Sequence, residues 1–218
     1  QQASRLSRQE EELRQTNVLR ASAERYRAML GHQAAPTLEP VVNATNLWCY
    51  VAMRLLKPTT VVETGCAAGW SSLLFLLALE RNQHGSLYTI DLPPVAGQLS
   101  MAWSLPEGVS AGFCVPEALR GRWTLIRGDV RQELLPLLER VRSIDVFHHD
   151  SDHSYEHMMW EYTSAWPHLS PHGILVSDDI GWNTAFWDFT TAVRRPFIIH
   201  RSSINMGAVA RHPATSYR

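Results

Sequence analysis

Aspartate lies at or just after the end of four predicted strands in this chain, as Asp91, Asp129, Asp150 and the pair Asp178–Asp179. Parallel strands end at a common edge of a sheet, and ligands of open α/β sheets bind outside that edge. One such aspartate commonly caps a turn or a helix. The repetition along one edge predicts instead a group of carboxylates that binds a ligand, a cation or a proton.

The run VVETGCAAGWSS, Val61 to Ser72, carries a second signal. Its β-branched residues are typical of a buried parallel strand, and Gly65 and Gly69 allow the positive φ angles and close backbone approach of a ligand-binding turn. The apolar helix that follows offers unpaired backbone N–H groups to an anionic part of a ligand. The run therefore predicts a nucleotide-like cofactor, against the alternative of an ordinary turn between a strand and a helix.

Asp91 narrows the kind of cofactor, because it follows Gly65 by 26 residues at the end of the next predicted strand. A carboxylate there accepts hydrogen bonds from the hydroxyls of a ribose. A dinucleotide turn has the pattern G-x-G-x-x-G, and Ala67 replaces its middle glycine. This disfavours NAD, although a nicotinamide-dependent oxidoreductase remains the alternative from another enzyme class.

The pattern E-x-G-x-x-x-G, with its acid 26 residues after the first glycine, resembles the class I S-adenosylmethionine-dependent methyltransferases. The segment Ile144 to Asn183, IDVFHHDSDHSYEHMMWEYTSAWPHLSPHGILVSDDIGWN, is similar to a block of the small O-methyltransferases of the catechol type and of the macrolide- or aminocoumarin-sugar type. The resemblance covers about residues 58 to 211. It implies methyl transfer to a hydroxyl of a small molecule, a phenol or a sugar. N-methylation, and a module that binds the cofactor without chemistry, remain alternatives.

The resemblance also implies which residues bind S-adenosylmethionine. Glu63, Gly65 and nearby backbone would hold the methionine moiety, Asp91 the ribose, and Asp129 with Val130 the adenine. The full set is Glu63, Gly65, Cys66, Ala67, Gly69, Ser71, Asp91, Asp129, Val130 and Asp150.

Many members of this group bind a divalent cation, and Asp150, Asp178 and Asp179 match their ligand positions. Three converging carboxylates would repel one another without a cation, whereas Mg²⁺ accepts hard oxygen ligands and keeps several waters. The cation would lower the pKa of the substrate hydroxyl. The alternatives are that Asp178–Asp179 caps the following helix, and that the methyltransferase needs no metal.

A base must take the hydroxyl proton, and Asp152 and His153 are the two candidates beside Asp150. Imidazole titrates near neutrality, and His153 lies where catechol-type members carry a lysine. The sequence does not choose between the two. Asp152 could equally cap the next helix, and His153 could pair with His157 as ligands of a transition metal.

Two segments depart from the family pattern. The run Ser170-Pro171-His172-Gly173 stands where Pro-Gly-Gly is usual, which predicts a reshaped turn. His148–His149 replaces apolar residues on a central strand, so one imidazole is expected to face the core and to need a partner.

Strands and helices alternate from Thr59 onward, which predicts a parallel sheet covered on both faces. The resemblance implies an α/β, Rossmann-like, doubly wound sheet of seven strands, mostly parallel with an antiparallel C-terminal strand, plus N-terminal helices. Strands are expected at 61–64, 86–91, 123–127, 144–150, 173–178, 196–201 and 206–211, and helices within 1–30 and at 43–56, 70–82, 130–142, 154–168 and 184–194.

Residues 1–57 are predicted to form a helical arm, for which homodimerisation is one hypothesis, and residues 58–218 the catalytic domain. The irregular stretch 93–122 is typical of a lid or binding loop. Aromatic residues near the expected opening suit stacking on an acceptor, with ordinary core packing as the alternative. They are Trp103, Phe113, Tyr155, Trp182, Phe186 and Trp187.

The composition excludes several functional classes. The net charge of -1 argues against a nucleic-acid partner held by bulk electrostatics. The cysteines, Cys49, Cys66 and Cys114, have neither disulfide-framework nor zinc-site spacing. The longest apolar run, Leu73 to Leu79, is far shorter than the roughly 20 residues that span a bilayer. We therefore expect a cytoplasmic protein with no membrane partner.

Overall fold

The computed structural model describes residues 17–30, 44–92, 105, 109–200 and 205–212. Its centre is a seven-stranded sheet in the order β3-β2-β1-β4-β5-β7-β6. β7 runs antiparallel to both of its neighbours, and the other adjacent pairs are parallel. The strands are β1 (Thr60–Thr64), β2 (Ser86–Asp91), β3 (Trp123–Arg127), β4 (Ile144–His149), β5 (Leu169–Ser177), β6 (Phe197–His200) and β7 (Met206–Ala210). The expected sheet is therefore confirmed.

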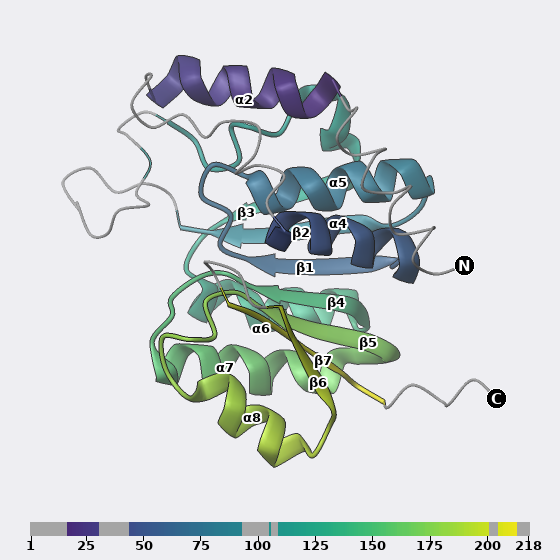
Figure 1. Ribbon diagram of the computed structural model, residues 1–218, viewed down its shortest axis with the longest axis vertical. Coiled ribbons are helices and arrows are strands. Elements are labelled where there is room, and N and C mark those ends of the chain that lie inside the picture. The colour runs from purple at the N-terminus through teal and green to yellow at the C-terminus, as the bar shows by residue number, and fades with distance from the viewer. Residues whose placement is uncertain (1–16, 31–43, 93–104, 106–108, 201–204, 213–218) are drawn as a thin grey trace.

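Helices cover both faces of the sheet (Figure 1). One face carries α4 and α5, with α2 outside them, and the other carries α6, α7 and α8. The helices are α2 (Asn17–Leu30), α4 (Ala44–Leu56), α5 (Trp70–Asn82), α6 (Val130–Val141), α7 (Tyr155–Ala165) and α8 (Ala185–Val193), with short 3₁₀ helices η2 (Glu117–Arg122) and η3 (Trp166–His168).

The central strands are apolar on both sides because both faces are buried. Val61 and Val146 point into the layer of α4 and α5, whereas Val62 and Phe147 point into the layer of α6, α7 and α8. This alternation continues to the strand ends. Thr64, the last residue of β1, therefore lies on the same side as the α7 layer.

The observed elements agree with the predicted ones, with one clear difference. β5 begins at Leu169 rather than at Gly173, because the segment Ser170–His172 is accommodated as an irregularity in the pairing with β4 between Ile144 and Val146. The unusual Ser-Pro-His-Gly run thus lies within β5 and not in a turn before it.

Several predictions lie outside the described residues. They concern 1–16, 31–43, most of the irregular stretch (93–104 and 106–108), and Trp103. The described end of that stretch contains η2. No helix among the described residues combines the length and apolar character needed to cross a bilayer.

The strand order reverses between β1 and β4, which lie side by side while their chain connections lead to opposite sides. In doubly wound sheets the carboxyl edge at such a reversal is where ligands bind. Thr64 and His149 are paired at this edge. The turn after Thr64 and the loop after His149 are consequently neighbours.

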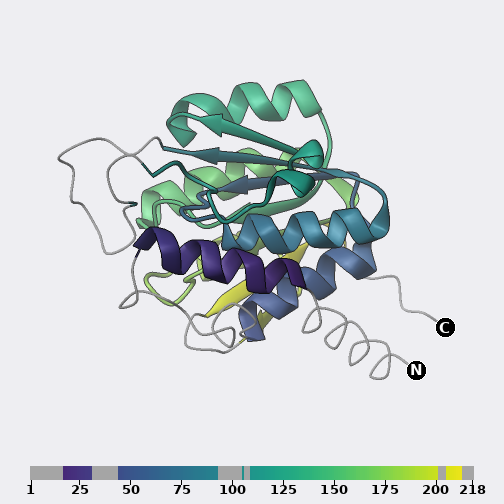
Figure 2. The same ribbon diagram turned by 90° about the horizontal axis from the view of Figure 1, so that it is seen from above.

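α2 lies beyond α5 on the side away from the sheet (Figure 1), and in the view from above it is in front of the sheet (Figure 2). The ring of Tyr26 is 5.5 Å from that of Trp70 and 5.9 Å from that of Phe113, centroid to centroid. Arg25 also donates to the carbonyl of Phe113. These contacts attach α2 to the first turn of α5 and to the loop before β3.

Candidate active site

Gly65 brings the predicted cofactor turn into contact with the loop after β4. Its φ is 76°, and its N–H donates to the carbonyl of Ile90 at 2.8 Å. A Cβ at this position would lie 1.9 Å from the carbonyl oxygen of Asp150. Only glycine allows the ends of β1 and β4 to approach this closely.

Asp91 closes the same turn from the end of β2. Its Oδ2 accepts hydrogen bonds from the backbone N–H groups of Cys66, at 2.8 Å, and Ala67, at 2.7 Å. Ala67 has a positive φ of 44°, which this anchoring supports. A carboxylate offers about four acceptor positions, so two of them suffice for the turn and the remainder suit ribose hydroxyls.

Glu63 points away from the edge and into the core beneath α5. Its Oε2 accepts from Ser72 at 2.5 Å and from Thr89 at 2.8 Å. Burial raises the pKa of Glu63 to about 7, although hydrogen bonds from Ser71, Ser72 and Thr89 oppose the shift. Oε1 lies 3.8 Å from Nδ1 of His148 and has no hydrogen-bond partner.

Asp129 and Val130, expected near the adenine, begin α6. Oδ1 of Asp129 accepts from the N–H of Arg131 at 2.8 Å, so Asp129 is the N-cap of the helix. The side chain of Val130 is buried against the sheet. Capping uses one oxygen of Asp129. The role of Asp129 in adenine binding stays a prediction.

The predicted metal ligands follow β4 and β5. The N–H of Asp150 donates to Thr64, and that of Asp178 to His149, each at 2.9 Å. Burial and then the charge of Asp178 raise the pKa of Asp150 well above its usual value. Burial and then Asp179 raise the pKa of Asp178 to about 6. These carboxylates therefore lie near enough to interact.

One feature of these three carboxylates suits the binding of a hard cation. Oδ1 of Asp178 is buried without a hydrogen-bond partner, which is costly for a carboxylate unless a ligand satisfies it. Among the described residues, however, no three or more His, Cys, Asp or Glu side chains are arranged to hold a metal ion. Mg²⁺ commonly uses one or two carboxylates and several waters, and the arrangement is compatible with that mode.

The two candidate bases differ in their surroundings. Oδ1 of Asp152 accepts from the N–H of Ser154 at 2.8 Å, in a turn that leads into α7. Nε2 of His153 lies 4.0 Å from Oδ1 of Asp150 and has no hydrogen-bond partner. Burial and then His149 lower the pKa of His153 to about 4. His153 is therefore the candidate with an unoccupied nitrogen beside the acids.

The hypothesis of a His153–His157 metal site is wrong, because both ring nitrogens of His157 are engaged. Its Nε2 lies 2.8 Å from Oε1 of Glu161, and its Nδ1 accepts from Nε of Arg131 at 3.3 Å. The prediction for the strand histidines is partly met. His149 has a partner in Glu161, whereas neither nitrogen of His148 is hydrogen-bonded.

Glu161 was not among the residues expected at the site. It lies on the buried side of α7 with Met158, Tyr162 and Ala165. An acidic residue at the spacing of an apolar helix stripe was the signal for it in the sequence, because such a residue is buried only when it has polar partners. Ser72 and Thr89, which hydrogen-bond Glu63, were not expected either.

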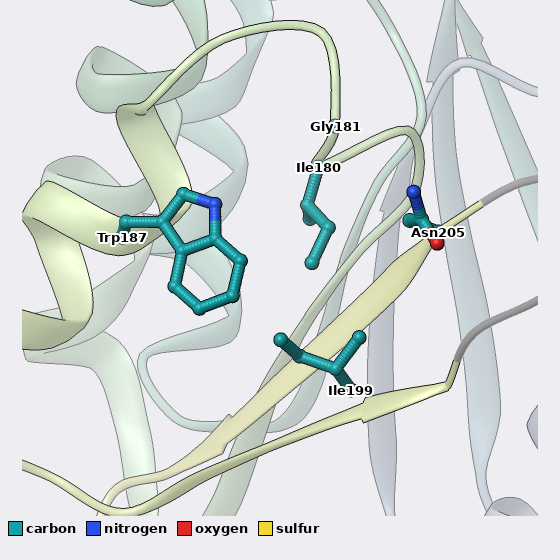
Figure 3. A pocket seen from close by; sticks show the side chains of 5 residues that line it. All are labelled: Ile180, Gly181, Trp187, Ile199 and Asn205. Carbon is teal, nitrogen blue, oxygen red and sulfur yellow. The ribbon is translucent and has the colours of Figure 1, made fainter.

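A hollow of about 190 Å³ lies just beyond the acid pair (Figure 3). Its walls come from the loop after β5, the start of α8, strand β6 and the residue before β7. They are Ile180, Gly181, Trp187, Ile199 and Asn205. Of the other predicted aromatic residues, Trp182 is exposed, whereas Phe186 is buried in the core and Phe113 packs under Tyr26.

Solved structures share this fold at low sequence identity. The S-adenosylhomocysteine-bound methyltransferase PaMTH1 from Podospora anserina has a TM-score of 0.61 and 14% identity, covering 89% of this chain and 87% of its own. The O-methyltransferase TomG from Streptomyces achromogenes, involved in tomaymycin synthesis and bound to S-adenosylmethionine, has a TM-score of 0.60 and 16% identity over 90% of both chains. An S-adenosylhomocysteine complex of a Bacillus cereus O-methyltransferase has a TM-score of 0.56 and 13% identity, covering 93% of this chain and 90% of its own.

No curated protein matches the sequence. The model of a family described as a methyltransferase domain matches residues 62–180, from β1 to the residue after the acid pair. That segment includes Gly65, Asp91 and Asp150, and it exceeds half of the 218 residues. Since fold and family model agree, the chain belongs to the methyltransferase-domain family.

Proposed function

We propose that this protein transfers a methyl group from S-adenosylmethionine to a hydroxyl oxygen of a small molecule. The observation that carries the proposal is the contact of Gly65 with Asp150, because it joins the cofactor turn to the acidic loop. A donor on the turn and an acceptor at the loop would then lie close enough for direct displacement. The like-folded O-methyltransferases support the choice of oxygen.

Bound S-adenosylmethionine supplies an electrophilic methyl group on a sulfonium centre. The protein's part is to bind and to orient. Asp91 would accept the ribose hydroxyls, and the backbone between Gly65 and Gly69 would bind the methionine moiety. His153 or Asp152 would accept the proton of the acceptor hydroxyl. The buried surroundings of His153 would exclude water from that step.

The carboxylates that follow β4 and β5 would bind a divalent cation at this site. Asp150 and Asp178, with Asp179 beside them, are the residues that would hold it. Such a cation lowers the pKa of a hydroxyl and neutralises the repulsion between the carboxylates. The orphaned Oδ1 of Asp178 supports this part of the proposal.

The hollow beside Trp187 is a candidate for the apolar part of the acceptor. An indole wall with one amide group nearby suits a flat or glycosidic molecule. We infer a small-molecule acceptor, with no nucleic-acid or membrane partner. The assay therefore includes both phenols and sugars as acceptors.

The direct test is transfer of a labelled methyl group from S-adenosylmethionine to a panel of phenols, sugars and amines. We expect product from hydroxyl compounds, no activity in EDTA, and recovery with Mg²⁺. Full activity in EDTA would contradict the cation and favour a metal-independent methyltransferase. Product from amines alone would contradict O-methylation.

Calorimetry measures cofactor binding independently of methyl transfer. We expect the protein to bind S-adenosylmethionine and not NADH, since Ala67 replaces the glycine of a dinucleotide turn. Asp150→Ala should abolish turnover while S-adenosylmethionine still binds. Binding without turnover on any acceptor in the wild type would instead indicate a module that holds the cofactor.

A further inference from the structure

Glu161 lies at the centre of a buried polar cluster between α7 and the site edge of the sheet. Its side chain is fully buried and accepts four hydrogen bonds, two on each oxygen. Oε2 accepts from Thr64 at 2.6 Å and from Nδ1 of His149 at 2.8 Å. Oε1 accepts from Ser151 at 2.5 Å and from Nε2 of His157 at 2.8 Å.

The cluster determines where its protons lie. Burial alone would raise the pKa of Glu161, but His149 and the hydrogen bonds from His157 and Ser151 hold it well below its usual value. An ionised carboxylate only accepts, so all four partners donate. Nδ1 of His157 accepts from Arg131, so its proton is on Nε2. The proton facing Glu161 from His149 is on Nδ1.

The partners of Glu161 belong to both halves of the site. Thr64 directly precedes Gly65 of the cofactor turn. His149 and Ser151 flank Asp150, and the ring of His149 lies 5.1 Å from that of His153. One buried side chain on α7 thus connects the methyl-donor turn to the acidic loop.

We propose that Glu161 is a positioning residue that fixes the His149 imidazole with its proton on Nδ1 and holds residues 149–153 against the cofactor turn. It acts through His149 and Ser151 and touches neither substrate nor cofactor. The kinetic part of this inference rests on the proposed methyl transfer. The position of the His149 proton does not depend on methyl transfer, and it can be measured in the free protein.

Glu161→Gln tests the proposal because it keeps the size of the side chain and replaces one acceptor oxygen by an NH₂ group. That group cannot face His157, whose Nδ1 is occupied by Arg131 and whose Nε2 must keep its proton. The amide nitrogen must therefore face Thr64 and His149, and His149 must move its proton to Nε2 to accept from it. Glu156→Gln is the matched control, since Glu156 is exposed on the same helix.

The first readout is the ¹⁵N spectrum of the imidazoles. We expect Nδ1–H for His149 in the wild type and in Glu156→Gln, and Nε2–H in Glu161→Gln. A wild-type His149 protonated only on Nε2 would overturn the proposal, whatever the variants do and whatever the protein catalyses.

The second readout is kinetic. Glu161→Gln should lower kcat roughly 10- to 100-fold, as is usual for residues that orient a site, with S-adenosylmethionine affinity within about threefold of wild type. Ser151→Ala should lower kcat in the same direction by less, and it serves if Glu161→Gln fails to fold. Folded Glu161→Gln with wild-type kcat, or with cofactor affinity falling as much as kcat, would contradict a positioning role. Absence of methyl transfer by the wild type would refute the proposed function. The ¹⁵N spectrum would still decide which nitrogen of His149 carries the proton.

Discussion

Glu63 is a carboxyl group enclosed beneath the cofactor turn, and this makes stability depend on pH. Its pKa is raised from 4.5 to about 7 in the folded protein, chiefly by burial. Between these values the folded state keeps a proton that the unfolded state has released, so the contribution of Glu63 to stability is full below the lower pKa and is lost as pH rises through the higher one. The loss is on the order of 3 kcal/mol across the window.

Glu63→Gln should remove this dependence, because glutamine resembles the protonated acid. We expect the free energy of unfolding of wild type, relative to Glu63→Gln, to fall as pH rises from 4.5 to about 7. Denaturant titrations at several pH values measure it. His148 lies 3.8 Å from Glu63, but burial lowers its pKa to about 3, so its imidazole is neutral in the folded protein across this window. A constant difference across the window would contradict the raised pKa of Glu63.

Gly65→Ala should destabilise the protein, because its Cβ would lie 1.9 Å from the carbonyl oxygen of Asp150. We expect a loss of at least about 2 kcal/mol in unfolding free energy, from overpacking and from the positive φ. Weaker S-adenosylmethionine binding should accompany it. Gly121→Ala is the control, since a Cβ there meets nothing within 4 Å. Equal stability of the two variants would contradict the close approach of turn and loop.

At the scale of elements, α2 is attached to the rest of the described fold by a ring cluster and an arginine, beside its buried residues Leu19 and Ala23. Tyr26 contacts Trp70 and Phe113, and Arg25 donates to the carbonyls of Phe113 and Val115. Tyr26→Ala should therefore release α2 while the sheet stays folded. The two aromatic pairs are worth roughly 1 to 3 kcal/mol together.

Hydrogen exchange measures this release. We expect faster exchange in α2 of Tyr26→Ala, with the strands still protected. Tyr26→Phe keeps the ring contacts and should behave as wild type. Unchanged exchange in Tyr26→Ala would contradict this prediction and would mean that the buried residues Leu19 and Ala23 hold the helix without the ring of Tyr26.

At the scale of the whole molecule, the predicted boundary between 1–57 and 58–218 stays a prediction. α4, which precedes it, packs on α5 and buries Leu47, Tyr50 and Met53 in the core. We therefore expect a fragment that begins at Pro58 to lose cooperative unfolding, because its core would be opened. A fragment that begins at Ala44 should keep it.

Calorimetric and circular-dichroism melting of the two fragments decides where the folding unit begins. A cooperative transition in the shorter fragment would support the boundary at residue 57. The hypothesis of a homodimer through the N-terminal helices is a separate one. Sedimentation of the full chain tests it.

The sequence by itself determined the alternation of strands and helices, the glycine turn and the acids at the strand ends, because these signals lie within a few residues of one another. The spacing from Gly65 to Asp91 predicted that both serve one ligand, and Asp91 does close that turn. The irregular start of β5 was not predictable, since it depends on pairing with Ile144.

Only the tertiary structure decided which way the polar side chains near the edge point. Glu63, expected at the cofactor, faces the core, and Asp129 caps a helix. Glu161 hydrogen-bonds Thr64 across 97 residues of sequence, and it also binds His149 and His157. Periodicity fixes the face on which a residue lies, but the partner of a buried charge depends on which strands and helices stack above it, and that is settled only when the layers pack together.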